Sequence, residues 1–416
     1  DGESVRVGPV WLNEARLSGR HDYTAGGEFR LQLLGDRLKL GESWIDSLDL
    51  LVQGTPQQHR LSFGAEGDLA TQLVLDGSLT DGDWAGSLQP MILRTSAGDW
   101  TLDEAVAVDY VESAGQLSLA QHCWLNQGQL DICIVELMLG ENGVAKANLD
   151  GDLGAIPELF PDRFRISAPL HAELDAIWQE LEVTTLDAAI ELQAGRVREN
   201  LMFGEFAEYV WEGASLQYRG SQEDGRLQGV MRQGGRDKLS LDLRIPAALD
   251  APLSGELLLQ GLNLTALSPF LEQFSHLSGE IPGDLAFLGR LGEPQIRGEL
   301  LLRDGAVALS STPNQLENIN LQANFTGRQA RLTGELSVGG GDSQLTGELD
   351  WLEGLSMSVA MSGGPKKLLF PTDTQLTVSE DLLLAIDSDS IRLTGRVEVP
   401  SGSVKLEELP QGAVEV

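Results

Sequence analysis

The phrase Thr-Gly-Glu-Leu occurs at Thr333–Leu336 and again at Thr346–Leu349, and variants of it recur between residues 251 and 399. The variants are Ser254-Gly255-Glu256-Leu257, Ser278-Gly279-Glu280-Ile281, Arg297-Gly298-Glu299-Leu300 and Thr394-Gly395-Arg396-Val397. Apolar and polar residues alternate around each glycine, so that Leu332 and Leu336 share a face with Gly334 while Thr333 points the opposite way. A period of two indicates a strand with one apolar and one polar face.

Each of these glycines lies in phase with the apolar residues, where a packed core would hold a side chain. Glycine inside a strand weakens it and marks a bend or the close approach of another group. A series of such positions favours either a strongly curved sheet or a groove that leaves room for a guest.

The spacing of the repeats predicts an all-β protein. Gly334 and Gly347 are 13 residues apart, which is close to the length of a short strand and its turn. The chain contains 48 glycines and is 42% hydrophobic, enough for a core. We expect an elongated, curved β-sheet, with short helices at 154–166 and 264–276 that cover an end or edge of it.

The strand pattern continues along the whole chain without a firm boundary. We divide it into an N-terminal strand array (1–153), a first helix-plus-strands module (154–263) and a second one (264–416), which together form one continuous sheet. Gly363–Lys367 is the clearest candidate for a loop or linker. Because the sequence begins at Asp1 within an alternating pattern, we expect a segment of a longer chain.

The formal net charge of −34 excludes the binding of nucleic acid or anionic membrane surfaces through a basic patch. Apolar runs are only about four or five residues long, far short of the roughly 20 needed to cross a bilayer. These residues show no signal-peptide pattern, and we expect the targeting information to lie outside this segment.

The two cysteines, Cys123 and Cys133, flank a turn signal at Asn126–Gln129. A hairpin centred on Gly128 places them opposite each other, near disulfide distance. We expect a disulfide, and hence an oxidising compartment; two buried thiols are the alternative.

The sequence has no pattern typical of catalysis. Its five histidines are scattered, and it contains no HExxH metal motif, nucleophile elbow or phosphate-binding loop. Asp387–Ser390 lacks the glycine and the distal Glu of a calcium loop, and we interpret it as a polar turn. We therefore expect no enzyme activity, no cofactor and no metal site.

Several phrases, in this order and combination, resemble the TamB family, which is related to the AsmA-like proteins. They are Trp84-Ala85-Gly86-Ser87-Leu88, Gly98-Asp99-Trp100-Thr101-Leu102, Cys123-Trp124 with Cys133, Pro294-Gln295-Ile296-Arg297-Gly298 and Val399-Pro400-Ser401-Gly402-Ser403. The resemblance implies a sheet folded lengthwise into a hydrophobic trough, called a β-taco. It also implies a periplasmic location, an N-terminal inner-membrane anchor absent here, and a BamA-like outer-membrane barrel partner, TamA.

The resemblance further implies a role in outer-membrane biogenesis, either phospholipid transport between the two membranes or assembly of barrel proteins. We expect acyl chains to lie in an apolar groove; a scaffold that pairs with unfolded barrel strands and a structural spacer with a sealed core are the alternatives. The expected lining consists of Leu253, Leu257, Leu259, Ile281, Ile296, Leu300, Leu302, Leu321, Phe325, Leu332, Leu336, Val338, Leu345, Leu349, Leu355, Met357, Val359, Met361, Ile391, Leu393, Val397 and Val399.

Overall fold

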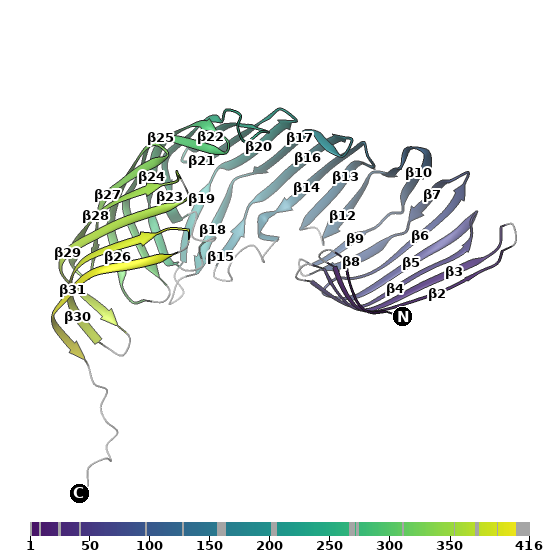
Figure 1. Cartoon of the computed structure of the whole chain (residues 1–416), viewed down its shortest axis with the longest axis horizontal. Coiled ribbons are helices and arrows are strands. Elements are labelled where there is room, and N and C mark those ends of the chain that lie inside the picture. The colour runs from purple at the N-terminus through teal and green to yellow at the C-terminus, as the bar shows by residue number, and fades with distance from the viewer. Residues whose placement is uncertain are drawn as a thin grey trace, which may run out of the picture. The chain divides into compact units, whose positions relative to one another are not determined.

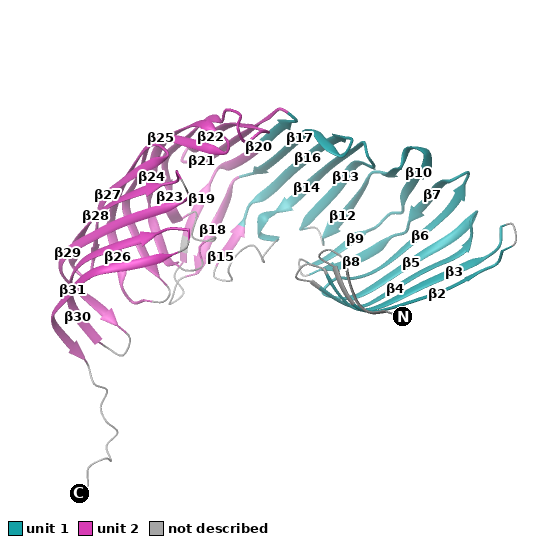
Figure 2. Cartoon of the chain, in the orientation of Figure 1, with its two compact units in different colours: residues 1–159, 167–193, 217–222 teal, residues 160–166, 194–216, 223–416 magenta. Residues whose placement is uncertain are grey.

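A computed structural model describes residues 2–7, 10–23, 26–40, 43–95, 98–126, 129–155, 164–200, 206–265, 271, 274–309, 312–352, 354–370, 374–388 and 390–404. The chain forms two compact units (Figure 2). Unit 1 comprises Asp1–Leu159, Ser167–Gln193 and Gln217–Gln222, and unit 2 comprises Phe160–Ile166, Ala194–Leu216 and Glu223–Val416.

Strands make up almost all of unit 1 (Figure 1). They are β1 (Gly2–Val7), β2 (Val10–His21), β3 (Phe29–Leu40), β4 (Ser43–Thr55), β5 (Gln58–Gly67), β6 (Ala70–Thr80), β7 (Asp83–Leu88), β8 (Met91–Thr95), β9 (Gly98–Leu102), β10 (Val106–Val111), β11 (Gln116–Leu119), β12 (His122–Asn126), β13 (Leu130–Leu139), β14 (Gly143–Asp152), β16 (Pro169–Gln179) and β17 (Glu182–Leu192). Two short 3₁₀ turns are present, η1 (Glu112–Ala114) and η2 (Leu153–Ala155).

Unit 2 is built in the same way. Its strands are β18 (Gly195–Asn200), β19 (Phe206–Trp211), β21 (Asp224–Gln233), β22 (Arg236–Pro246), β23 (Ser254–Asn263), β24 (Phe274–Arg290), β25 (Glu293–Leu309), β26 (Gln315–Gly327), β27 (Gln329–Val338), β28 (Gly341–Asp350), β29 (Ser356–Phe370), β30 (Thr374–Ile386) and β31 (Ile391–Val404). The short β15 (Phe164–Ser167) and β20 (Gly213–Ser221) each contribute residues to both units.

The all-β, curved-sheet class predicted from the sequence is confirmed. Successive strands pair antiparallel, as in β2 with β3 and β27 with β28, and Figure 2 shows a curved sheet in each unit. The turn between β27 and β28 illustrates the local cause. Gly339 and Gly340 have φ of 57° and 78°, and two central residues with positive φ give the turn whose twist matches a two-strand hairpin.

The predicted helices are present only as short 3₁₀ turns at their first residues, 154–155 in η2 and 264–265, and they are wrong at their ends. Residues 164–166 and 274–276 are strand, at the starts of β15 and β24. Residues 156–163, 266–270 and 272–273 lie outside the described residues. The three- and four-residue spacing of apolar side chains that suggested the second helix therefore extends into a strand, where pairing with β25 determines the conformation.

The predicted loop at Gly363–Lys367 is also wrong, because these residues lie within β29. Glycine and proline normally punctuate strands. Here they form a bulge inside one, since the pairing with β30 shifts between Gly363 and Lys366. Proline is tolerated at a bulge because the residue there is left out of the ladder.

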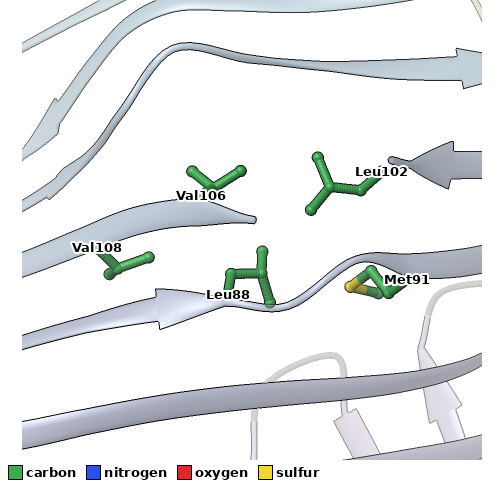
Figure 3. Packing of buried hydrophobic residues seen from close by; sticks show 5 residues of the cluster. All are labelled: Leu88, Met91, Leu102, Val106 and Val108. Carbon is green, nitrogen blue, oxygen red and sulfur yellow. The ribbon is translucent and has the colours of Figure 1, made fainter. Parts of the chain in front are cut away.

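A compact apolar cluster stabilises unit 1 around β7 to β10 (Figure 3). Leu102 and Val106 are each only 2% exposed. Leu88, Met91 and Val108 complete the buried cluster. Partly buried side chains pack against it, including Trp84 of β7 and Leu75 of the neighbouring β6.

The predicted disulfide is confirmed. Cys123 of β12 pairs directly with Cys133 of β13, and the two are joined as a disulfide. The chain reverses between the two strands through a turn in which the Gln129 N–H donates to the Asn126 carbonyl at 2.8 Å. The hairpin thus places the cysteines opposite each other, as the sequence spacing predicts.

The repeated glycines on the apolar side lie opposite large side chains. Gly334 pairs with Leu321 on one side and Leu345 on the other. A Cβ atom at Gly334 would lie 2.5 Å from Leu321 Cδ2, and one at Gly255 would lie 2.6 Å from Leu243 Cδ2. The neighbouring strand occupies the space at these positions, which favours the curved-sheet interpretation over vacancies for a guest.

We expect Gly298→Ala to destabilise unit 2. Gly298 has φ of 129°, and its added Cβ would overlap the Asp284 carbonyl oxygen. Strain at such a position costs about 1–3 kcal/mol, so the free energy of unfolding, measured by urea denaturation with circular dichroism, should fall by that amount. Gly364→Ala is the control, because a Cβ there meets nothing within 4 Å, and its effect should stay within about 0.5 kcal/mol. Equal stability of the two variants would contradict the close-approach explanation.

Candidate functional site

In unit 2, β22 to β30 align their apolar residues in rows, because directly paired residues of antiparallel neighbours project from the same face. Leu257 pairs with Leu285, for example, and Leu349 pairs with Met357. We call the three rows the apolar face. The first contains Leu241, Leu257, Leu285, Gly298, Phe325, Ala330, Leu349, Met357 and Ile386; the second Leu239, Leu259, Gly283, Leu300, Ala323, Leu332, Gly347, Val359 and Leu384; the third Leu302, Leu321, Gly334, Leu345, Met361 and Leu382.

Most residues of the expected lining lie in these rows or continue them. Ile296 pairs with Phe287 beside the first row, and Ile281 pairs with Leu262. Leu355 lies outside the strands, just before β29, and is 64% exposed. Leu253 is buried ahead of β23. The lining residues expected from β31 are all exposed; they are Ile391, Leu393, Val397 and Val399.

Burial differs between the two ends of the strands that carry the apolar face. Near one end, Ile319, Leu336 and Val338 form a buried cluster, against which Leu345 and Leu368 pack. Along the rest of the face, residues such as Leu332, Leu349 and Val359 are only partly buried. In the first row, Leu285 and Ala330 are buried as well. The face is therefore covered at one end, closed at these two positions and partly accessible at the others.

The cover is the last part of β29, residues Lys366–Phe370, which we call the strap. The Lys367 N–H donates to the Gly339 carbonyl at 3.0 Å. Farther along, the Leu369 N–H donates to Asn314 Oδ1 and the Asn314 amide donates to the Leu369 carbonyl, both at 2.8 Å. Asn314 precedes β26 and Gly339 follows β27, so the strap crosses the ends of strands that are not its sheet neighbours.

A buried polar triad lies where the strap separates from β28 while remaining paired with β30. Lys366 Nζ donates to Glu380 Oε1 and contacts Ser343 Oγ, which itself donates to Glu380 Oε1 at 2.7 Å. Ser343, Lys366 and Glu380 are 1%, 3% and 8% exposed. An ion pair this deeply buried is stable only when its partners satisfy one another, because each charge has lost its hydration.

The sequence pattern does not predict this triad as a whole. Glu380 alternates in phase with Val378 and Leu382, so the period of two does place a carboxylate on the apolar side. Lys366 has no such signal, because the bulge before it inverts the alternation relative to Gly363. Only the pairing of Gly363 with Glu380 and of Lys366 with Val378 shows that the ammonium faces inward.

The opposite end of the apolar face carries an aromatic pair, which we call the aromatic rim. The rings of Phe325 and Trp351 lie 6.4 Å apart between centroids. Trp351 Nε1 donates to the Pro294 carbonyl at 2.9 Å, so the indole is fixed with an apolar body and a satisfied polar group. Arg328 lies beside it and donates through Nη2 to the Trp351 carbonyl at 2.7 Å.

Polar groups surround the aromatic rim. The Leu352 N–H donates to Asp350 at 2.8 Å, and this hydrogen bond, followed by that from Gln329, lowers the pKa of Asp350 below its ordinary value. Arg328 Nε is buried and has no hydrogen-bond partner. The rim therefore combines aromatic, anionic and cationic groups, unlike the aliphatic rows beside it.

The described residues contain no group of three or more His, Cys, Asp or Glu side chains placed to hold a metal ion. No helix in the described part of the chain is long and apolar enough to cross a membrane. On the polar side of unit 2, a depression of about 400 Å³ is lined by hydrophilic residues that include Arg303, Gln322 and Glu335.

Residues 1–302 match the family model for the N-terminal domain of TamB. The chain belongs to the TamB family. The translocation and assembly module subunit TamB of Haemophilus influenzae is 22% identical over 420 residues, which cover 97% of this chain and 31% of that relative. This TamB-family chain therefore spans about a third of the relative's length. No solved structure matches it.

We expect a coupling between Lys366 and Glu380 in this TamB-family chain. Lys366→Met leaves a buried, unpaired carboxylate, so the free energy of unfolding should fall by about 3–5 kcal/mol in urea denaturation. Lys366→Met combined with Glu380→Leu should recover most of that loss, because no buried charge remains.

The matched control is Arg331→Met, which removes an exposed cation 4.0 Å from Glu348 and should change stability by less than about 1 kcal/mol. Additive effects of the Lys366 and Glu380 substitutions would contradict the coupling.

Proposed function

We propose that this chain is part of a periplasmic bridge on which phospholipids pass between the inner and outer membranes of Gram-negative bacteria. The observation that carries the proposal is the continuous apolar face from β22 to β30, whose residues are partly exposed along most of the rows. A sealed core would bury such residues fully.

The free-energy cost of exposing lipid acyl chains to water explains why a lipid carrier needs a surface such as the apolar face. Two acyl chains of about 16 carbons cost roughly 25 kcal/mol in water, at about 0.8 kcal/mol for each CH₂ group. Aliphatic rows can shield acyl chains while a charged headgroup stays in solvent. The second row, for example, contains Leu332, Val359 and Leu384. Few polar groups interrupt the rows, so a lipid finds little preference for one row over the next, which favours sliding over storage.

Family membership supports the cellular setting of the proposal. The Haemophilus relative is named as a subunit of a translocation and assembly module. We place this chain in an envelope protein anchored in the inner membrane, with the barrel protein TamA as a partner that binds mostly through regions beyond these residues. In this proposal the chain shields and guides its cargo and carries out no catalysis.

A second candidate function is favoured by the words "assembly module" in the relative's name. In this alternative, the chain is a scaffold for outer-membrane barrel proteins and pairs with their unfolded strands through exposed backbone groups.

Photo-crosslinking in cells, with Leu349 replaced by a photoreactive residue, distinguishes the two candidate functions. Phospholipid adducts support the bridge, whereas adducts to barrel proteins support the scaffold.

We expect Leu349→Asp to reduce the phospholipid retained by the purified chain at least tenfold, measured by mass spectrometry, because it places a charge in the first row. Glu348→Arg is the matched control: it changes a charge on the polar side of the same strand and should leave retention unchanged. Circular dichroism and the melting temperature establish that both variants are folded. Retention by Leu349→Asp equal to that of the parent chain would rule out this face as the lipid site.

A further inference from the structure

The two ends of the apolar face differ in what they offer a lipid. At the strap end, Lys366 and its partner Glu380 are the only charged side chains among the described residues that face the rows. Both are buried and bonded to each other and to Ser343. A phosphate could therefore not reach Lys366 without separating a buried ion pair.

The aromatic rim offers the opposite chemistry. Trp351 has an amphipathic ring of the type that lies at the boundary between hydrocarbon and water. Arg328 adds a guanidinium whose side chain is 21% exposed and whose Nη1 lies 3.8 Å from the exposed Glu293 carboxylate. Its Nη2 donates to the Trp351 and Leu352 carbonyls and its Nε is buried, so Nη1 is the group within reach of a ligand. A phosphodiester group can accept a hydrogen bond from Nη1 in place of the exposed Glu293 carboxylate, because an exposed ion pair at this distance is weak.

The distance between the two ends matches a lipid chain. Along β28, Leu349 adjoins the aromatic rim and Ser343 belongs to the buried triad. These residues are six positions apart, or about 20 Å at about 3.3 Å per residue. One leaflet of a bilayer has a hydrocarbon depth of about 15 Å, half of the roughly 30 Å core. The face is deep enough for acyl chains of membrane phospholipids and stops shortly beyond their length.

We propose that unit 2 holds phospholipids in one orientation, with the phosphodiester headgroup at Arg328 and the aromatic rim, and with the acyl ends at the strap. The strap, held by the triad and by its hydrogen bonds to Gly339 and Asn314, forms a floor that limits the acyl length the face accepts. This inference rests on the proposed lipid-carrying function and specifies the orientation and chain length of the cargo.

Photo-crosslinking from two matched positions tests the orientation. Met357 and Met361 lie on the same strand and both face the rows, Met357 near the aromatic rim and Met361 near the triad. Each is replaced in turn by benzoylphenylalanine, the full chain is loaded with dipalmitoyl phosphatidylethanolamine, and adducts are mapped along the acyl chain by tandem mass spectrometry. We expect adducts from position 357 near the glycerol and adducts from position 361 near the terminal methyl group.

Each outcome of the mapping is informative. The reverse order, or the same distribution from both positions, overturns the single orientation while leaving the lipid function intact. The absence of lipid adducts at both positions overturns the proposed function itself, and the orientation with it.

Acyl length tests the floor. Lys366→Met combined with Asn314→Leu removes the cation of the triad and both hydrogen bonds between Asn314 and Leu369. The strap should then loosen, and lipids that co-purify with this variant should shift toward longer chains, with at least a twofold rise in species above 18 carbons. Lys366→Met/Glu380→Leu keeps the strap in place through apolar contact and should retain the parent profile. Identical profiles in all three proteins, each shown to be folded, would refute a limit set by the strap.

Discussion

The structure of unit 2 depends on one steric constraint, the pairing of a glycine with a large aliphatic residue on the adjacent strand. Gly283 lies opposite Leu300, and Gly334 lies opposite Leu321. Without a Cβ, the backbone of one strand can approach the side chain of the next, so adjacent strands draw together on the apolar side and the sheet curves toward it. The register is fixed by the same pairs, because a slip of one residue would turn every leucine to the polar side.

This constraint also explains why the apolar face remains partly exposed. A flat sheet with such a surface would need a second layer to cover it. A curved sheet lets its own side chains shelter one another, as Leu332 and Val359 do on either side of Gly347 in the second row. At the strap end, where Leu368 reaches the cluster of Ile319 and Val338, the cover is complete.

Local sequence rules predicted the features that local geometry determines. The alternation of apolar and polar residues predicted that the chain forms strands and that residues such as Leu349 and Met357 lie on the apolar face. The turn signal at Asn126–Gln129 predicted that the two cysteines lie opposite each other. The strap could not be predicted in this way, since Asn314 and Leu369 are 55 residues apart and meet only through the three-dimensional path of β29. The helix predicted to begin at Leu264 was wrong at its end because pairing with β25 outweighs a short apolar spacing.

The bulge at Gly364 and Pro365 has a consequence for how such chains can change in length. An extra residue within a strand reverses the parity of every side chain beyond it, so Lys366 faces inward only because one residue was added before it. An insertion or deletion of one residue inside such a strand would move every lipophilic side chain beyond it to the hydrophilic face, and every hydrophilic side chain to the lipophilic face. Lineages of this architecture should therefore gain or lose residues at turns, in even numbers, or together with a compensating bulge.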